Sequence, residues 1–407
     1  MVKKIVKSYD YTLIVAVLLL CTFGLVMVYS SSMVLAASSP KFGENPTFFF
    51  DRQKMALFVG VLGFLFTLIL PYKIYANKRM LLLIVLGSVF MLLLVFVVGH
   101  TANNAQSWIM VGARGIQPSE FTKLSVIIYL AAVYSKKQAY INQFDKAVMP
   151  PIIFTFFICL AVAIQPDFGT AFIIGLIALS VIVCSGMGIK SIGKLLLLVL
   201  ITVAVLSPIV LIKADEIFSD ERMSRFTGFA DPFNNEAGDG YQLVNSYIAL
   251  GAGGWKGLGL GQSIQKFNYL PEAHTDFIMA IIAEELGLFG VMFVLALLAY
   301  IVLRGFLIAR KCTDPFGSLL AIGISSMIAI QTFINLGGLT GLIPITGVTL
   351  PFISYGGSSL LLLMLSMGIL INVSMFTNYH SMYSNKEKKP QNQKVQQRFQ
   401  KNYVSYR

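Results

Sequence analysis

Long apolar runs constrain this chain more than any other feature of its sequence. Ten segments are apolar over roughly 17 to 25 residues, the length that an α-helix needs to cross a membrane. A spanning segment must satisfy its own backbone hydrogen bonds, so such runs predict helices. An even number of crossings places both termini on one side. The predicted spans are residues 12–34, 55–71, 80–99, 119–135, 147–165, 168–187, 194–213, 277–303, 318–341 and 357–376.

Composition excludes a soluble protein. Hydrophobic residues make up 56% of the 407 residues and charged residues only 12%, whereas an average globular chain is about 25% charged. The mean hydropathy is +0.76. The predicted fold is therefore all-α, a polytopic membrane helix bundle. The net charge of +12 does not require nucleic acid as a partner, because basic residues also set membrane orientation.

The distribution of charge predicts the orientation of the bundle. With the N-terminus inside, most of the 31 basic residues fall in cytoplasmic segments, as the positive-inside rule requires. We therefore expect cytoplasmic N- and C-termini and a large extracellular loop, 214–276, between the seventh and eighth helices. Residues 1–376 form the predicted ten-helix membrane domain, with an uncleaved first helix. Residues 377–407 are predicted to be a basic, disordered cytoplasmic tail.

Polar chemistry gathers on the predicted outer face. Its longest segment is the 214–276 loop, and long ordered loops usually carry function. The loop contains a glycine-rich stretch, 251–261, that matches neither GxGxxG nor GxxxxGK[ST]. A surface turn and a phosphate-binding backbone are both open for this stretch. Shorter polar segments lie at 51–54, 108–123 and 165–170.

Asp276 is the leading catalytic candidate. It stands where the outer loop becomes the eighth helix, and a partly desolvated carboxylate there can act as a general base. The alternative is that Thr275 or Asp276 only caps the helix. Glu284 and Glu285 lie about two turns deeper, and 100° per residue allows at most one of them to share a cavity with Asp276. For both we favour buried polar contacts between helices.

Basic side chains on the outer face are the second group of candidates. Arg114, Lys123, Arg222 and Arg225 stand on a face that is otherwise short of cations. They can bind an anionic ligand, or each can pair with a nearby acid. His274 is an acid–base candidate for Asp276, with a simple hydrogen-bonding role as its alternative.

Five motifs together resemble the SEDS family (shape, elongation, division and sporulation). The resemblance covers essentially the whole chain, including the ten-span layout, and LPEAHTDF fits the division and sporulation branches better than the elongation branch. The motifs are QPSEFTKL at 117–124, QPDFGT at 165–170, GYQLVNSYIALGAGGWKGLGLG at 240–261, LPEAHTDFIMAIIAEELG at 270–287 and PFISYGGSS at 351–359.

The resemblance implies a peptidoglycan glycosyltransferase that polymerises lipid II outside the cytoplasmic membrane. The family's essential aspartate falls on Asp276, which would deprotonate the 4-hydroxyl of an acceptor GlcNAc. That oxygen attacks C1 of the donor MurNAc and expels undecaprenyl diphosphate, with inversion. Charge grows on the leaving group, so outer cations suit it. The candidate substrate-binding residues are Arg52, Arg114, Lys123, Glu120, Arg222, Arg225, Lys256, His274 and Ser358.

The resemblance also implies partners. These are a class B penicillin-binding protein, which is a transpeptidase, other divisome membrane proteins, and membrane lipid. No cofactor is expected beyond a divalent cation, Mg²⁺ or Mn²⁺, and the sequence holds no dedicated metal-ligand cluster. The expected location is the cytoplasmic membrane, as a multi-pass protein at the division septum.

Two other functions stay open. The first is a lipid II flippase, since ten spans and the intramembrane Glu284 and Glu285 suit translocation. Against it, the charges concentrate at the outer end, whereas transporter sites lie near the midplane. The second is a non-catalytic scaffold for division proteins.

Overall fold

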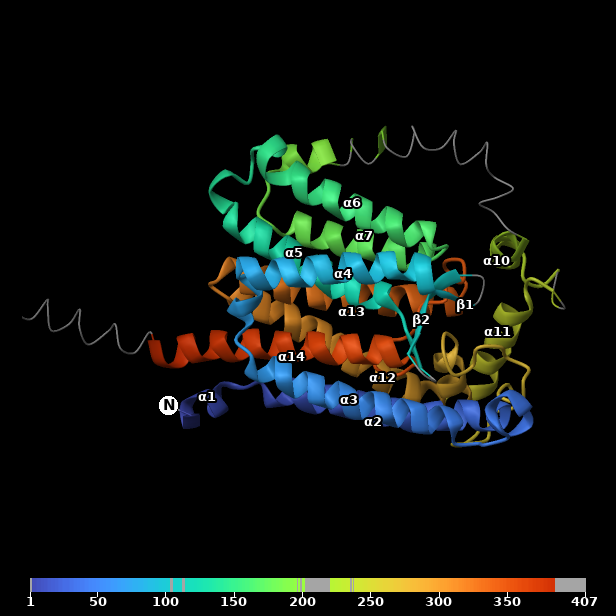
Figure 1. Cartoon of the computed structure of the whole chain (residues 1–407). Coiled ribbons are helices and arrows are strands. Elements are labelled where there is room, and N and C mark those ends of the chain that lie inside the picture. Colours follow the sequence, from blue (N-terminus) through green and yellow to red (C-terminus); the bar gives the residue numbers. More distant parts are fainter. Residues whose placement is uncertain are drawn as a thin grey trace, which may run out of the picture.

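The chain is described by a computed structural model over residues 2–102, 105–111, 114–195, 197, 200–201, 220–234, 236 and 238–384. Long helices lie side by side in a bundle, and a small sheet and short helices cover one end (Figure 1). The long helices are α2 (Tyr11–Ser38), α3 (Phe48–Ile69), α4 (Lys78–Val98), α5 (Pro118–Lys136), α6 (Met149–Ile164), α7 (Phe168–Val183), α12 (Ile278–Lys311), α13 (Pro315–Leu339) and α14 (Gly357–Tyr379).

The predicted apolar runs coincide with these helices. The run at 194–213 is the exception, because most of it lies outside the described residues. Within the described residues, seven helices are long and apolar enough to cross a membrane, and α7 is a shorter apolar helix. A multi-pass helical membrane protein is therefore confirmed, whereas the number of ten crossings stays a prediction. The seven are Tyr11–Ser38, Phe48–Ile69, Lys78–Val98, Phe144–Ile164, Ile278–Lys311, Pro315–Leu339 and Gly357–Tyr383.

Helices α5, α13 and α14 form the centre of the bundle. The most apolar 18-residue windows of α13 and α14 are 67% and 78% buried, against 17% for that of α4. Small residues allow close approach here, as is usual between membrane helices. A Cβ on Gly323 of α13 would meet Ile127 of α5, and one on Gly368 of α14 would meet Thr67 of α3.

The N-terminal helix and the end of α14 lie together at one end of the bundle (Figure 1). Helix α1 (Val2–Ser8) packs on α14, and Asn378 Nδ2 donates to the Ser8 carbonyl at 3.1 Å. Helix α14 and the following turn, η5 (His380–Ser384), carry helical structure into the first part of the predicted tail. Residues 385–407 of that tail lie outside the described residues. Short helical turns η2 (Tyr72–Ala76), η3 (Gln138–Tyr140) and η4 (Phe144–Val148) complete the connections.

A three-stranded antiparallel sheet lies at the opposite end, so the all-α prediction is wrong for this segment. It consists of β1 (His100–Ala102), β2 (Ala105–Val111) and β3 (Arg114–Ile116), in the order β1-β2-β3. The register pairs His100 with Trp108 and Ile109 with Ile116. Strands of three and seven residues are too short for their alternation to stand out beside long apolar runs.

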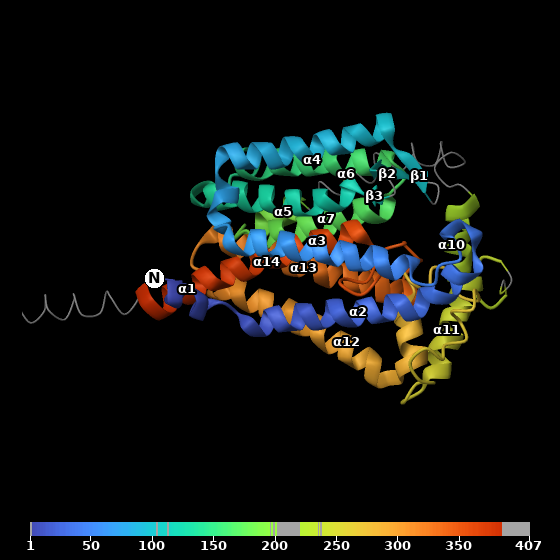
Figure 2. The same cartoon turned by 60° about the horizontal axis from the view of Figure 1, so that its bottom comes forward.

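The end of the bundle that carries this sheet also carries α10 (Asp220–Ala230), α11 (Tyr241–Gly253) and the turn η1 (Pro40–Phe42). We call it the site end. Helix α11 lies across the ends of the long helices (Figure 1). Helix α12 bends sharply near its start (Figure 2), where Gly287 has φ 64° and ψ −159°. The first part of α12, Ile278–Leu286, is therefore a separate short helix.

Candidate active site

Asp276 stands in the turn that leads into α12 at the site end. The helix begins at Ile278 and its N-cap position is Phe277. Thr275 is held elsewhere, because its hydroxyl donates to the Glu272 carbonyl at 3.1 Å. Neither Thr275 nor Asp276 is therefore the N-cap residue. Glu272 has a positive φ of 55°, a backbone strain that is common at functional sites.

The main chain of this turn is fixed by the loop before α14. Tyr355 N donates to the His274 carbonyl at 2.9 Å, and Ser354 Oγ donates to the Thr275 carbonyl at 2.5 Å. Gln53 of α3 supports the same loop, since its Nε2 donates to the Ser354 carbonyl at 3.2 Å. Both ends of this link are buried. The turn is thus held through its backbone carbonyls, so substitution of its side chains would leave these hydrogen bonds in place.

Asp276 itself is held by α13. Asn335 Nδ2 donates to the Asp276 carbonyl and to the Val348 carbonyl, each at 2.8 Å. The carboxylate lies against Gly347, where a Cβ would stand 3.6 Å from Asp276 Oδ2. Gly347 has φ +73°, a conformation that favours glycine. The Asp276 side chain is half-buried, so it is partly removed from water beside an open backbone surface.

An aromatic cluster with one cation adjoins the turn. The His274 ring lies 4.4 Å from the ring of Phe49 and 5.6 Å from that of Tyr355, measured between centroids. Arg52 lies over the Phe48 ring at 4.1 Å and hydrogen-bonds Tyr355. Two aromatic side chains therefore hold Arg52 beside Tyr355, whose backbone N–H bonds the His274 carbonyl, and its role in substrate binding stays a prediction.

The environment sets the charge state of His274. Burial lowers the pKa of His274, and the nearby Glu272 carboxylate only partly opposes this. Burial raises the pKa of Tyr355, whereas the charge and hydrogen bond of Arg52 act to lower it. His274 is therefore neutral near pH 7 and packs between rings. An aromatic spacer describes its geometry better than an acid–base partner for Asp276.

The start of α5 joins two further predicted motifs. Gln117 Nε2 donates to Asp167 Oδ2 at 2.9 Å, and Ser119 Oγ reaches the same oxygen at 3.3 Å. Gln117 N donates to Ser358 Oγ at 3.1 Å. Asp167 also caps α7, because its side chain accepts from Thr170 N. The candidate Ser358 thus links the first turn of α14 to α5.

Glu120 and Lys123 form a buried ion pair one turn further along α5. Lys123 Nζ lies 2.6 Å from Glu120 Oε1, and 1% of the Lys123 side chain is exposed. In the described part of the structure Glu120 Oε2 is buried without a hydrogen-bond partner. A buried carboxylate oxygen normally has a partner. The pair therefore offers one unsatisfied acceptor in addition to its internal bond.

Four candidates remain: the side chains of three lie outside the described part of the structure, and the fourth is Lys256. Arg114 lies in β3 and Arg222 and Arg225 lie in α10, but their side chains are among those not described. Lys256 is exposed just beyond α11. Its backbone lies against Gly287, so Lys256 is at the far end of the short helix from Asp276.

The glycine-rich stretch 251–261 packs against the break in α12. Gly257 N donates to the Gly253 carbonyl at 2.7 Å, and Leu288 N donates to the Gly254 carbonyl at 3.0 Å. A Cβ on Gly253 or Gly257 would collide with the backbone of the short helix. The N–H groups of Gly257, Leu258 and Gly259 all donate to carbonyls of the protein, so the structure favours a packing role over the phosphate-binding alternative.

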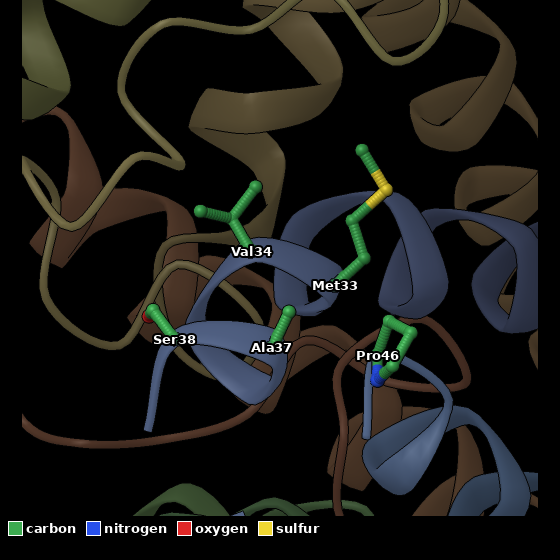
Figure 3. Close-up of a pocket in the computed structure, with 5 residues that line it drawn as sticks. All are labelled: Met33, Val34, Ala37, Ser38 and Pro46. Atoms are coloured by element: carbon green, nitrogen blue, oxygen red, sulfur yellow. The ribbon is translucent and has the colours of Figure 1, made fainter. Parts of the chain in front are cut away.

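An apolar pocket opens near the site end of α2 (Figure 3). It has a volume of about 430 Å³ and contains none of the predicted site residues. Alkyl groups dominate its walls, so it suits hydrocarbon rather than a charged group. The pocket is lined by Met33, Val34, Ala37, Ser38 and Pro46.

In the described residues no three His, Cys, Asp or Glu side chains gather to hold a metal ion.

Sequence reasoning missed three residues that brace the site. Gln53 and Ser354 stand in segments that already drew attention, but nothing local marks them as supports of the Asp276 turn. Asn335 lies within an apolar run. A polar side chain inside a span is itself a functional signal, and that signal would have found Asn335.

Comparison with known proteins decides the family. The cell cycle protein family that groups FtsW, RodA and SpoVE matches residues 11–379. The chain belongs to this family. The probable peptidoglycan glycosyltransferase FtsW of Bacillus subtilis (strain 168) is 58% identical to this family member over 389 residues, covering 96% of the chain and 95% of the relative. Stage V sporulation protein E of the same organism is 41% identical over 372 residues, covering 91% and 98%.

Solved structures show the same fold. One chain of a structure described as "Structural coordination of polymerization and crosslinking by a peptidoglycan synthase complex" aligns with a TM-score of 0.70 at 24% identity, covering 91% of this FtsW/RodA/SpoVE-family chain and 98% of that one. The rod shape determining protein RodA of Thermus thermophilus aligns with a TM-score of 0.63 at 25% identity, covering 90% and 96%. The family resemblance predicted from the motifs is therefore confirmed.

Proposed function

We propose that this protein is a peptidoglycan glycosyltransferase that polymerises lipid II at the outer face of the cytoplasmic membrane. Asp276 acts as the general base and removes the proton from the 4-hydroxyl of an acceptor GlcNAc. The acceptor oxygen then bonds to C1 of the donor MurNAc while the bond from C1 to undecaprenyl diphosphate breaks, with inversion. The 58% identity to the Bacillus subtilis relative, a probable peptidoglycan glycosyltransferase, supports this activity.

One observation carries the proposal: polar motifs from distant parts of the chain meet around Asp276 at one end of an apolar bundle. The turn is braced by the loop before α14 and by α13. Such hydrogen bonds hold a general base at a fixed position, from which it can reach the reacting hydroxyl of a bound substrate. The Asp276 carboxylate is half-buried and lies beside Gly347, which adds no side chain there, and we propose that the acceptor sugar approaches on this side.

The diphosphate needs cations as its charge grows in the transition state. Arg52 is the best described candidate for this role, because the rings of Phe48 and Tyr355 hold its guanidinium and Tyr355 also contacts His274. Lys123 is already paired with Glu120. In the part of the chain that the structure describes, no three His, Cys, Asp or Glu side chains gather, so a divalent cation, Mg²⁺ or Mn²⁺, would be held with one or two protein carboxylates and the diphosphate itself.

The decisive experiment compares two acid-to-amide variants in liposomes that contain lipid II. Asp276→Asn should bind lipid II and form no glycan polymer, because the amide cannot accept the proton. Glu44→Gln, on an exposed outer loop, is the matched control and should polymerise like the wild type. Normal polymer from Asp276→Asn would overturn the proposed role of Asp276.

The transporter alternative rested on Glu284 and Glu285. Both carboxylates are buried. Glu285 bonds Ser30 of α2, which supports the predicted contact between helices, whereas Glu284 bonds loop residues Ser263 and Ile264 instead of another helix. The specific observation that favoured lipid II translocation is thereby accounted for. Protein-dependent transfer of fluorescent lipid II across a liposome membrane without polymer would restore that alternative. Rescue of depleted cells by Asp276→Asn would instead support a non-catalytic scaffold.

A partner follows from the same proposal. The structure with a TM-score of 0.70 belongs to a peptidoglycan synthase complex, described in terms of polymerisation and crosslinking. We therefore propose a class B penicillin-binding protein as the transpeptidase partner, with other divisome membrane proteins at the septum. Lipid II polymerisation measured with and without that transpeptidase tests whether the pair acts together.

A further inference from the structure

The short helix Ile278–Leu286 ends in an unusual way. At Gly287 the chain leaves helical geometry, and Leu288 N donates to the Gly254 carbonyl at 3.0 Å. The last carbonyls of a helix need partners, and here the outer loop supplies them. Leu258 N donates to the Glu284 carbonyl and Gly259 N to the Glu285 carbonyl, each at 2.9 Å. The helix is thus closed by the backbone of the outer loop.

The Glu284 side chain makes a second connection to that loop. Its carboxylate accepts from Ser263 Oγ at 2.5 Å and from Ile264 N at 2.8 Å. Only 1% of Glu284 is exposed. Backbone and side chain of one residue therefore hold the same stretch of loop, which leaves the end of the short helix little freedom relative to it.

The neighbouring Glu285 connects the helix to a buried cation and to α2. Lys266 Nζ lies 3.1 Å from Glu285 Oε1 and donates to the Gly261 carbonyl at 2.6 Å. Ser30 of α2 donates to both Glu285 oxygens, at 2.7 and 2.8 Å. Neither side chain of the ion pair has any exposed surface. We call Lys266, Glu285 and Ser30 the base cluster.

The short helix is consequently fixed at both ends. Asp276 lies at one end, where Asn335 and Ser354 hold the turn, and the base cluster lies at the other. We propose that the base cluster positions Asp276 for catalysis, by fixing the tilt of the helix that follows it. This inference rests on the proposed function of Asp276 and extends it to residues that touch no substrate.

The geometry makes such a role effective. Glu285 follows Asp276 by nine residues, which is about 13.5 Å along a helix axis at 1.5 Å per residue. A tilt of about 10° at the base would move the other end by about 2 Å, and a misplacement of about 1 Å can cost about 100-fold in rate. A small loosening at the base is thus amplified at the carboxylate.

The competing explanation is that the base cluster only stabilises the fold. A substitution of Ser30 on α2 separates this explanation from a role in positioning Asp276. Removing one partner of a buried ion pair strands a charge and destabilises the protein. Ser30→Ala avoids this, because Glu285 keeps Lys266. Ser32 of the same helix provides a matched control. It is also buried, at 0% exposed against 5% for Ser30, but among the described residues its hydroxyl bonds only the Val28 carbonyl of its own helix.

The test measures full-length protein in liposomes by hydrogen–deuterium exchange and by lipid II polymerisation. Ser30→Ala should accelerate amide exchange at residues 274–280 and lower kcat by about threefold to tenfold, the effect of one lost hydrogen bond, with KM for lipid II unchanged. Ser32→Ala should change neither. Unchanged exchange and kcat in Ser30→Ala would overturn the inference.

A paired variant gives a second, stronger test. Lys266→Met with Glu285→Gln removes both charges, so neither is stranded, and its thermal midpoint should stay near that of the wild type. Its kcat should fall at least about tenfold with KM unchanged, whereas full activity would contradict the positioning role. If the wild type makes no polymer, the proposed function fails, and the exchange data on Ser30→Ala still decide whether the cluster orders the Asp276 turn.

Discussion

At the scale of single residues, burial gives the few charged groups at the site end their importance. Lys123 is 1% exposed and its only described ionic partner is Glu120. Water cannot replace a lost partner at such a position, so the pair must be kept or removed as a unit. Surface pairs behave differently, because solvent screens them and they contribute little to stability.

We expect Lys123→Met to destabilise the protein by about 3–5 kcal/mol, because it strands the Glu120 carboxylate in the bundle. Thermal unfolding in detergent measures the loss. Lys54→Met is the control, since Lys54 is exposed on α3 and its replacement should have little effect. The double variant Lys123→Met with Glu120→Gln should recover most of the stability, and a double variant as unstable as the single one would contradict the argument.

His274 gives a pH-dependent prediction. Burial places its folded pKa below the unfolded value, so the unfolded chain takes up the proton first. The stabilising effect of the neutral ring is therefore complete above about pH 6.5 and is lost as the pH falls below that value, by at most about 1.4 kcal/mol per pH unit. Thermal midpoints at pH 7.5 and 5.5 should differ less in His274→Phe, which keeps the ring contacts. An equal difference in both proteins would rule out His274 as the cause.

At the scale of elements, α12 shows how one glycine divides a continuous apolar run. The run 277–303 predicts one helix, yet Gly287 has φ 64° and lies against the backbone of Gly257 and Trp255. Other residues cannot adopt this conformation without strain, and a Cβ would also collide with the loop. The break is therefore set by a contact between two distant segments, which no local pattern records.

Gly287→Ala should destabilise the protein by more than about 2 kcal/mol, through backbone strain and the collision with the loop. Gly251→Ala is its control. That glycine lies in α11 with no atom near its Cβ position, so alanine should stabilise the helix by about 0.5–1 kcal/mol. Thermal unfolding of both variants checks the contrast, and similar midpoints would refute it.

The sequence predicts the helices well, but it predicts the tertiary hydrogen bonds that hold the candidate site poorly, for physical reasons. Apolar runs must be helical in lipid, so α2 to α7 and α12 to α14 follow from composition. Asp276, Arg52 and Ser358 could be found because they stand in recognisable segments. The bonds that brace Asp276 join residues that are 59 and 79 positions apart. Only tertiary packing brings such partners together, and this also explains why the sheet and the base cluster were not predicted.

At the scale of the whole molecule, orientation in the membrane is the prediction with the widest consequences. The basic segments gather at the end that carries α1 and the end of α14, and the site end carries Asp276. If the positive-inside rule holds for this chain, Asp276 faces the side where lipid II is polymerised and where no nucleotide is available.

Thiol labelling of intact cells tests this orientation. After replacement of the four native cysteines, all of which are free, single cysteines are placed at the exposed Lys256 and Lys146. A membrane-impermeant maleimide should label Lys256→Cys in intact cells and Lys146→Cys only after permeabilisation. The reverse pattern would place Asp276 in the cytoplasm and remove the basis of the proposed function.

The backbone bracing of the Asp276 turn has a practical consequence. The carbonyls of His274, Thr275 and Asp276 carry the bonds, and a carbonyl survives any change of side chain. A variant with a non-ionisable residue at position 276 should therefore keep its fold and still compete with the active protein for binding partners. In a growing cell such an inactive variant should therefore be dominant-negative, because it occupies the binding partners of the active protein. The same variant should also be suitable for isolating the complex with bound substrate.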